Sequence, residues 1–135
     1  MSNKTSYQFH QDGTTPPNGY VFVFGSNEAG RHGKGAAKAA ADHYGAIYGV
    51  PEGYMEDSVT KRASYAIPTK NRQISTLSLD EIRHHVDRFK QFAKNHPEKQ
   101  FFMTRIGCVL AGYQNEDIAP MFAGATDNIN FPEDW

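Results

Sequence analysis

Apolar residues are grouped in short blocks that polar or glycine-rich segments separate. Blocks of β-preferring residues at positions 20–24, 64–67 and 101–106 predict strands, and their nearly continuous hydrophobicity is typical of a parallel sheet that is buried on both faces. A shorter block at 46–50 predicts a further strand. The polar segment 51–62 that follows it is predicted to be an irregular excursion.

Three segments have helical patterns. Residues 36–44 are rich in alanine, and Gly45 stands where a helix commonly ends. The clearest helix begins at Ser78, which has capping-box spacing to Glu81. Its apolar positions recur at helical intervals and are Leu79, Ile82, Val86, Phe89, Phe92 and Ala93. A short helix is predicted at 115–122 with Asn115 as its cap.

The alternation of strands and helices predicts one α/β domain, in which helices cover both faces of a mixed, mostly parallel sheet. Residues 20–135 are expected to form this domain. For residues 1–19 two alternatives stand: an edge strand anchored by Tyr7 and Phe9, or a loose arm.

Composition narrows the classes of function. The chain has 135 residues, which suits one domain, and its net charge of −1 argues against binding of bulk nucleic acid. A single cysteine excludes an internal disulfide. No apolar core marks a signal peptide, and no apolar stretch is long enough for a membrane span, so a cytoplasmic protein without membrane contact is expected.

The most informative segment is the glycine-rich loop that follows the strand at 20–24. It contains Gly25, Gly30, Gly33 and Gly35 and leads into the alanine-rich helix. Glycines allow backbone N–H groups to approach an anion, and a helix N-terminus favours negative charge. The loop lacks the lysine and hydroxyl residues of a Walker A motif and does not fit a dinucleotide fingerprint.

Side chains in this loop have two interpretations each. Asn27 either hydrogen-bonds a ribose hydroxyl or closes the loop as an Asx turn. Arg31 either binds a phosphate in bidentate fashion or lies on an ordinary solvated face, and the same alternative stands for His32, a residue type that commonly titrates near neutral pH. Lys34 and Lys38 either add local positive charge or belong to an ordinary solvated face.

Two further segments are expected at the same edge of the sheet. Thr69 and Lys70 end one strand, and Lys70 is available to neutralise a phosphate. A second glycine loop at 107–113 follows the last central strand, with Arg105 just before it. In this loop Tyr113 is placed to stack on a ring, and Cys108 is interpreted as a packed thiol. No spacing of histidine, cysteine or acidic residues predicts a metal site.

Several motifs resemble a largely uncharacterised family of short phage and bacterial proteins. They lie at residues 24–27, 30–37, 64–70, 104–108, 110–113 and 118–122. More distantly, the order of parts is similar to the macro domain, an ADP-ribose-binding fold, with Asn27 and the two glycine loops at the matching positions. The resemblance implies a macro-like domain that binds ADP-ribose or a related nucleotide, with Asp12 as the acidic residue available to adenine. A phage origin would place the protein in a bacterial host cell.

The resemblance leaves three functions open. The first is nucleotide binding, with or without hydrolysis of an ADP-ribosyl or phosphoester bond. In that hydrolysis a water held between Asn27 and the second glycine loop would attack, with His32 as general base. The second is a non-catalytic phage sponge for a nucleotide immune signal. The third is an interaction protein without a small ligand. The expected ligand-binding residues are Gly25, Ser26, Asn27, Gly30, Arg31, Gly33, Gly35, Thr69, Lys70, Arg105, Gly107, Cys108, Gly112 and Tyr113. No cofactor is expected, and the oligomeric state stays open.

Overall fold

A central sheet organises the computed structural model, which describes residues 7–108 and 111–135. The described strands are β1 (Gln8–His10), β2 (Tyr20–Asn27), β3 (Gly53–Glu56), β4 (Ala63–Lys70), β5 (Gln100–Met103) and β6 (Ile129–Pro132). Their order across the sheet is β1-β6-β5-β2-β4-β3. Neighbouring strands are parallel, except that β3 runs antiparallel to β4. The predicted mixed, mostly parallel sheet is confirmed, and the segment at 8–10 forms an edge strand.

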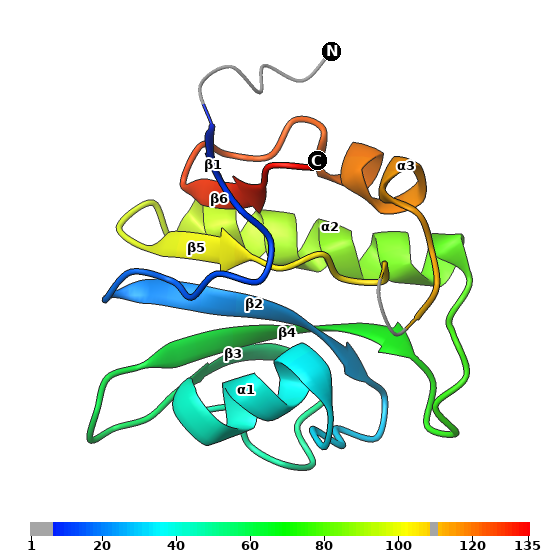
Figure 1. The fold of residues 1–135 in the computed structure, drawn as a ribbon, viewed down its shortest axis with the longest axis horizontal. Coiled ribbons are helices and arrows are strands. Elements are labelled where there is room, and N and C mark those ends of the chain that lie inside the picture. The colour runs from blue at the N-terminus through cyan, green and yellow to red at the C-terminus, as the bar shows by residue number, and fades with distance from the viewer. Residues whose placement is uncertain (1–6, 109–110) are drawn as a thin grey trace.

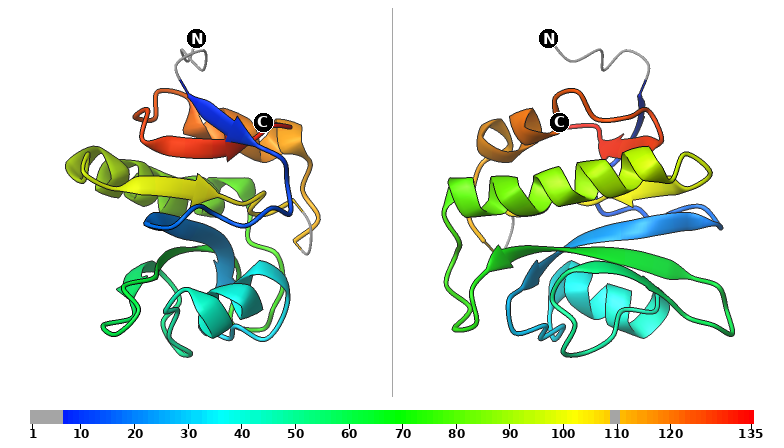
Figure 2. Two further views of the ribbon diagram at one scale, coloured as in Figure 1. Left: turned by 60° about the vertical axis from the view of Figure 1, so that its left-hand side comes forward. Right: turned by 180° about the vertical axis from the view of Figure 1, so that it is seen from behind.

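Helices cover the sheet from both sides and produce three layers. In Figure 1, α1 (Gly35–His43) lies in front of the sheet and α2 (Leu79–Asn95) lies behind it, and the views in Figure 2 agree. The short helices α3 (Asn115–Ile118) and η2 (Ala119–Phe122) follow β5, and η2 packs near α2. No helix in the described parts of the chain is long and apolar enough to span a membrane.

Two hydrophobic cores follow from the alternation of side chains along β2. Val21 and Val23 face α2 in the larger core, whereas Phe22 and Phe24 lie under α1 in the smaller one. Helix α2 begins with the predicted capping box, in which the Ser78 side chain and Glu81 exchange hydrogen bonds. Its apolar stripe is buried against the sheet.

Several predicted boundaries are wrong. Residues 46–50 form no strand; Gly45 and Gly49 have φ angles of +73° and +93°, which interrupt extended backbone. Strand β3 instead lies inside the segment that was expected to be irregular. Strand β4 continues through Pro68 to Lys70, and the cap of α3 is Gln114 rather than Asn115.

The parallel strands bring the two glycine loops to one edge of the sheet. Asn27 at the end of β2 pairs with Lys70 at the end of β4, after a bulge at Ser26. Just beyond β5, the Thr104 backbone N–H donates to the Val23 carbonyl at 3.1 Å. The segments after β2, β4 and β5 therefore converge, as predicted from the topology.

Candidate functional site

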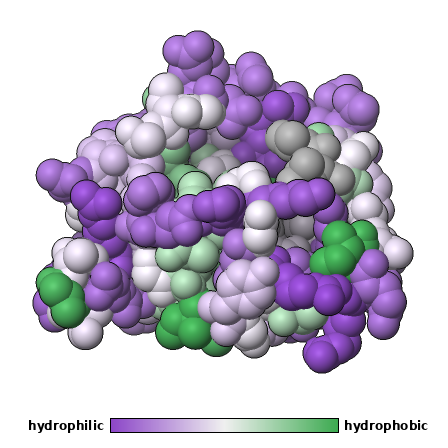
Figure 3. Space-filling view, turned by 60° about the horizontal axis from the view of Figure 1, so that its bottom comes forward, coloured by the Kyte–Doolittle hydropathy of each residue, from purple (hydrophilic) through white to green (hydrophobic). Residues whose placement is uncertain are grey.

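A cavity of about 830 Å³ opens where these segments converge. It extends from the carboxyl edge of the sheet onto the face that carries α1. Its lining in the described structure comes from residues 10, 12–15, 22, 25–27, 31, 33–37, 39, 43, 44, 48, 69, 70, 74, 102, 104–107 and 111. In Figure 3, pale and light green atoms lie recessed between hydrophilic residues on one side of the molecule.

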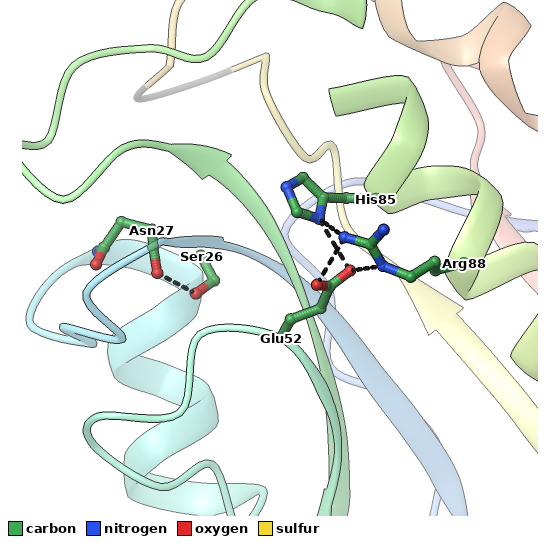
Figure 4. Close-up of polar contacts among 5 residues, drawn as sticks. All are labelled: Ser26, Asn27, Glu52, His85 and Arg88. Carbon is green, nitrogen blue, oxygen red and sulfur yellow. Dashed lines mark hydrogen bonds and ion pairs between the residues drawn. The ribbon is translucent and has the colours of Figure 1, made fainter. Parts of the chain in front are cut away.

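Asn27 lies at the end of β2, in the lining of this cavity, and is 8% exposed (Figure 4). Its Oδ1 accepts hydrogen bonds from the backbone N–H groups of Ala29 and Arg31 at 3.2 and 3.0 Å. Its Nδ2 donates to the Arg31 carbonyl at 2.7 Å. The Asn27 amide therefore closes the glycine loop on itself, which is the Asx-turn alternative.

The first glycine loop contributes backbone to the cavity on both sides of Arg31. Gly25, Gly33 and Gly35 lie in the lining, and Gly35 is the first residue of α1 with a φ of +58°. No side chain caps the N-terminus of α1, and its first turn has no acidic residue. Its leading N–H groups thus have no side-chain acceptor at a place where the helix dipole favours an anion.

Gly30 has a different position. It is not part of the cavity lining, and its N–H donates to the Asn27 carbonyl at 2.9 Å. The Gly49 N–H in turn donates to the Gly30 carbonyl at 2.8 Å. The structure therefore places Gly30 in the packing of the loop rather than in the described lining of the cavity.

His32 is buried, with 2% of its surface exposed, and it is not among the described lining residues. Its ring packs edge-on against Phe24 and Tyr48, and Nε2 lies 3.2 Å from the Val50 carbonyl oxygen. Burial lowers the pKa of His32, against the opposing effect of carbonyls at Val50 and Ile47. The imidazole thus lacks the cavity contact that the predicted general base requires.

Positive charge surrounds the cavity, although the whole chain has a net charge of −1. The cationic residues in its described lining are Arg31, Lys34, Lys70 and Arg105, and the only carboxylate there is Asp12. Arg31 Nη2 donates to the Arg72 carbonyl at 2.6 Å, which holds the guanidinium at the rim. This local excess of positive charge favours an anionic ligand.

The second glycine loop contributes less than predicted. Gly107, with a φ of +75°, lies in the lining, but Cys108, Gly112 and Tyr113 do not. The Tyr113 hydroxyl donates to the Leu77 carbonyl at 2.7 Å, so the ring packs against the core rather than standing free to stack on a ligand. Burial raises the pKa of Cys108 to about 11, which suits a packed thiol. Residues 109–110 of this loop lie outside the described residues.

Sequence reasoning missed an aromatic part of the cavity. Phe22 and Phe102 are register partners on β2 and β5, and both line the cavity. Tyr44 stacks on Phe22 with centroids 4.6 Å apart, and His10 stacks on Phe102 at 3.7 Å. No motif links these four residues, because strand register brings Phe22 to Phe102, strand β1 brings His10, and the end of α1 brings Tyr44.

The N-terminal segment also lines the cavity, through His10, Asp12 and residues 13–15. It reaches the site because β1 pairs with β6 at the far side of β5. Within the described ranges, no group of three histidine, cysteine or acidic side chains is arranged to hold a metal ion.

A second polar cluster, also in Figure 4, lies between the start of β3 and α2. Glu52 accepts from Arg88 Nε and Nη2, both at 3.0 Å, and lies 2.9 Å from His85 Nδ1. Burial acts to raise the pKa of Glu52, but the hydrogen bonds from Arg88 and His85 lower it overall. None of the three residues lines the cavity, so the cluster attaches the edge of the sheet to α2.

Comparison with known proteins identifies the fold. No family model and no curated protein matches the sequence. The macrodomain of Mycobacterium tuberculosis DarG superposes with a TM-score of 0.68 and 14% identity, covering 90% of this chain and 94% of that one. A protein of unknown function from Bacteroides thetaiotaomicron gives 0.63 and 16%, covering 93% of this chain and 96% of the other.

Thermosipho africanus DarTG, solved in complex with ADP-ribose, also gives a TM-score of 0.63 with 16% identity. The match covers 87% of this chain and 39% of the DarTG chain. Together with the three-layer architecture and the strand order, these likenesses show that the chain has a macrodomain-like α/β fold.

Proposed function

We propose that this chain binds ADP-ribose or a closely related nucleotide diphosphate. The observation that carries the proposal is the division of one cavity into a cationic, amide-rich part and an aromatic part. A nucleotide diphosphate has the same division, since its phosphates are anionic and its base is flat and apolar on its faces.

The phosphates would lie at the carboxyl edge of the sheet. There the uncapped N-terminus of α1 and the backbone at Gly33 and Gly107 line the same cavity as Lys70 and Arg105. Backbone amides bind phosphate without side-chain ordering, and an arginine adds charge-assisted hydrogen bonds.

The base would lie over the sheet face beside α1. Phe22 and Phe102 are buried beneath this part of the cavity, and Tyr44 and His10, which stack on them and are only half-buried, offer ring surface to a base. Aromatic surfaces bind nucleobases by stacking, at about 1–3 kcal/mol per base. The macrodomain-like fold and the ADP-ribose complex of DarTG support the proposed class of ligand.

We further propose binding without turnover. Of the two candidate catalytic residues, His32 lies outside the described lining, and the Asn27 amide holds its own loop. Asp12, the sole carboxylate in the described lining, is paired with Arg105. This arrangement favours the sequestering alternative over hydrolysis.

The third alternative, an interaction protein without a small ligand, has less support. The large apolar residues exposed in the described structure are Phe9, Ile47, Tyr48, Val59 and Ile74. On the side shown in Figure 3, the strongly hydrophobic residues form separate patches rather than one continuous face. A docking surface for a protein partner is normally a contiguous patch.

Titration calorimetry with ADP-ribose tests the proposal directly. We expect saturable binding, weakened about tenfold or more in Lys70→Ala, because one charge-assisted contact contributes about 1.5–3 kcal/mol. Lys61→Ala, which removes an exposed lysine outside the described cavity lining, is the matched control and should leave affinity unchanged. Absence of binding to ADP-ribose, ADP and NAD would contradict the proposal.

Chromatography of ADP-ribosyl ligands after incubation with the protein tests turnover. Release of a product would contradict binding without turnover and support the hydrolysis alternative.

A further inference from the structure

Arg105 is the cavity cation with the most elaborate set of partners. It follows β5 at the carboxyl edge of the sheet, and its side chain is 24% exposed. Nε donates to Asn115 Oδ1 at 3.0 Å, and Nη1 donates to Asp12 Oδ2 at 3.4 Å. The guanidinium therefore lies between a neutral acceptor and a carboxylate.

The neutral acceptor is itself fixed from a second direction. Asn115 Oδ1 also accepts a hydrogen bond from Trp135 Nε1 at 3.0 Å. The Trp135 ring packs against Phe122 and Phe131, with centroid distances of 5.3 and 6.4 Å. Both of those phenylalanines are fully buried, so this side of the network is anchored in the hydrophobic core.

The two partners of Arg105 have opposite effects on its charge. Asn115 orients the guanidinium without neutralising it, because an amide has no net charge. Asp12 opposes the charge, but its contact is longer, and its side chain is 37% exposed on the N-terminal segment. Exposed ion pairs of this kind are weak. An incoming anion can therefore replace Asp12 more easily than Asn115.

We propose that Asn115, oriented by Trp135, is a positioning residue that holds Arg105 for the phosphates of the ligand. Asp12 contacts Nη1 of Arg105 in the structure, and a phosphate oxygen takes its place on binding, while the bond from Nε to Asn115 persists. This inference rests on the proposed function and adds to it a group outside the described cavity lining, since neither Asn115 nor Trp135 is among the residues that form it.

Trp135 provides a direct readout, because it is the only tryptophan in the chain. We expect its fluorescence to change on titration with ADP-ribose or with inorganic pyrophosphate, which lacks the base. The change should be lost in Arg105→Ala. Calorimetry should show binding weakened roughly tenfold in Asn115→Ala, as expected when a hydrogen bond to a charged group is lost. Trp135→Phe keeps an aromatic ring but removes the N–H donor, and it should weaken binding by a smaller factor.

A double-mutant comparison separates positioning from a general structural role. In the Arg105→Ala background, Asn115→Ala should have no further effect on affinity, whereas a structural residue would still weaken binding. Asp12→Asn should tighten pyrophosphate binding, because it removes the competing carboxylate. If Asn115→Ala does not fold, the Trp135→Phe and Asp12→Asn variants decide the question.

The outcomes distinguish this inference from the proposed function. Suppose that pyrophosphate binds with the expected dependence on Asn115 but ADP-ribose does not bind. This outcome would contradict the proposed nucleotide ligand and support the positioning role of Asn115. ADP-ribose binding that Asn115→Ala leaves unchanged would overturn the positioning role alone. Failure to bind either compound would overturn both.

Discussion

Gly30 and Gly49 lie so close together that a Cβ atom built on Gly30 would be 2.5 Å from the Gly49 carbonyl carbon. The Gly49 N–H also donates to the Gly30 carbonyl at 2.8 Å. The two glycines thus join the loop after β2 to the loop that follows α1. Because the first of these loops supplies backbone to the cavity, the contact fixes the shape of the site from outside.

Gly30→Ala is expected to destabilise the protein and to weaken ADP-ribose binding. The φ of +69° disfavours alanine by about 1–2 kcal/mol, and the clash adds roughly 1–3 kcal/mol. Gly49→Ala is the matched control, since its φ is +93° and no atom lies within 4 Å of its added Cβ. Chemical denaturation should show a clearly larger loss for Gly30→Ala, and equal losses would exclude the packing explanation.

The Asn27 side chain is expected to stabilise the loop through both its Oδ1 acceptor and its Nδ2 donor. Asn27→Asp keeps an acceptor for the backbone N–H groups of Ala29 and Arg31 but loses the donor to the Arg31 carbonyl. Asn27→Ala loses all three bonds and leaves partly buried backbone groups without these partners, at about 1 kcal/mol for each bond. We expect melting temperatures in the order wild type, Asn27→Asp, Asn27→Ala. An Asn27→Ala protein as stable as the parent would show that the amide does not hold the loop.

Acid is expected to destabilise the fold through His32. Its folded-state pKa is lowered by burial, so the unfolded chain binds the proton more readily. The stability that neutral His32 contributes is complete above the unfolded-state pKa of about 6.5. It is lost as pH falls from there through the lower folded-state pKa. Urea midpoints measured between about pH 5 and 7 should therefore rise with pH, and His32→Gln should flatten this rise. His84→Gln, at an exposed position, is the control for the loss of a histidine as such.

The capping box of α2 gives a prediction away from the site. Ser78 Oγ accepts from the Glu81 N–H at 3.2 Å, and Glu81 Oε1 accepts from the Ser78 N–H at 3.1 Å. Ser78→Ala should cost about 1 kcal/mol of unfolding free energy. Ser58→Ala, at an exposed turn, should change stability by less than about 0.5 kcal/mol. Neither variant is expected to alter ADP-ribose affinity, because neither residue is in the described lining of the cavity.

The pattern of apolar and capping residues predicted those helices and strands that are stabilised mainly by residues close together in the sequence. The apolar blocks of β2 and β4, the stripe and capping box of α2, and the alanine-rich α1 all appear in the structure near their predicted positions. Parallel topology then predicted that the loops after β2 and β5 meet at one edge, because all parallel strands end on the same side. The predictions were wrong where backbone geometry outweighed composition, as at 46–50, where glycines with positive φ prevent a strand.

The sequence by itself thus determined the fold class, the edge at which the loops converge and the glycines and cations that line this edge of the cavity. Only the tertiary structure decided what individual side chains do there. It placed His32 in the core, committed the Asn27 amide to its own loop, and brought Asp12 to Arg105 across 93 positions. Those roles depend on which groups from distant segments become neighbours, and strand register and packing settle that, not local composition.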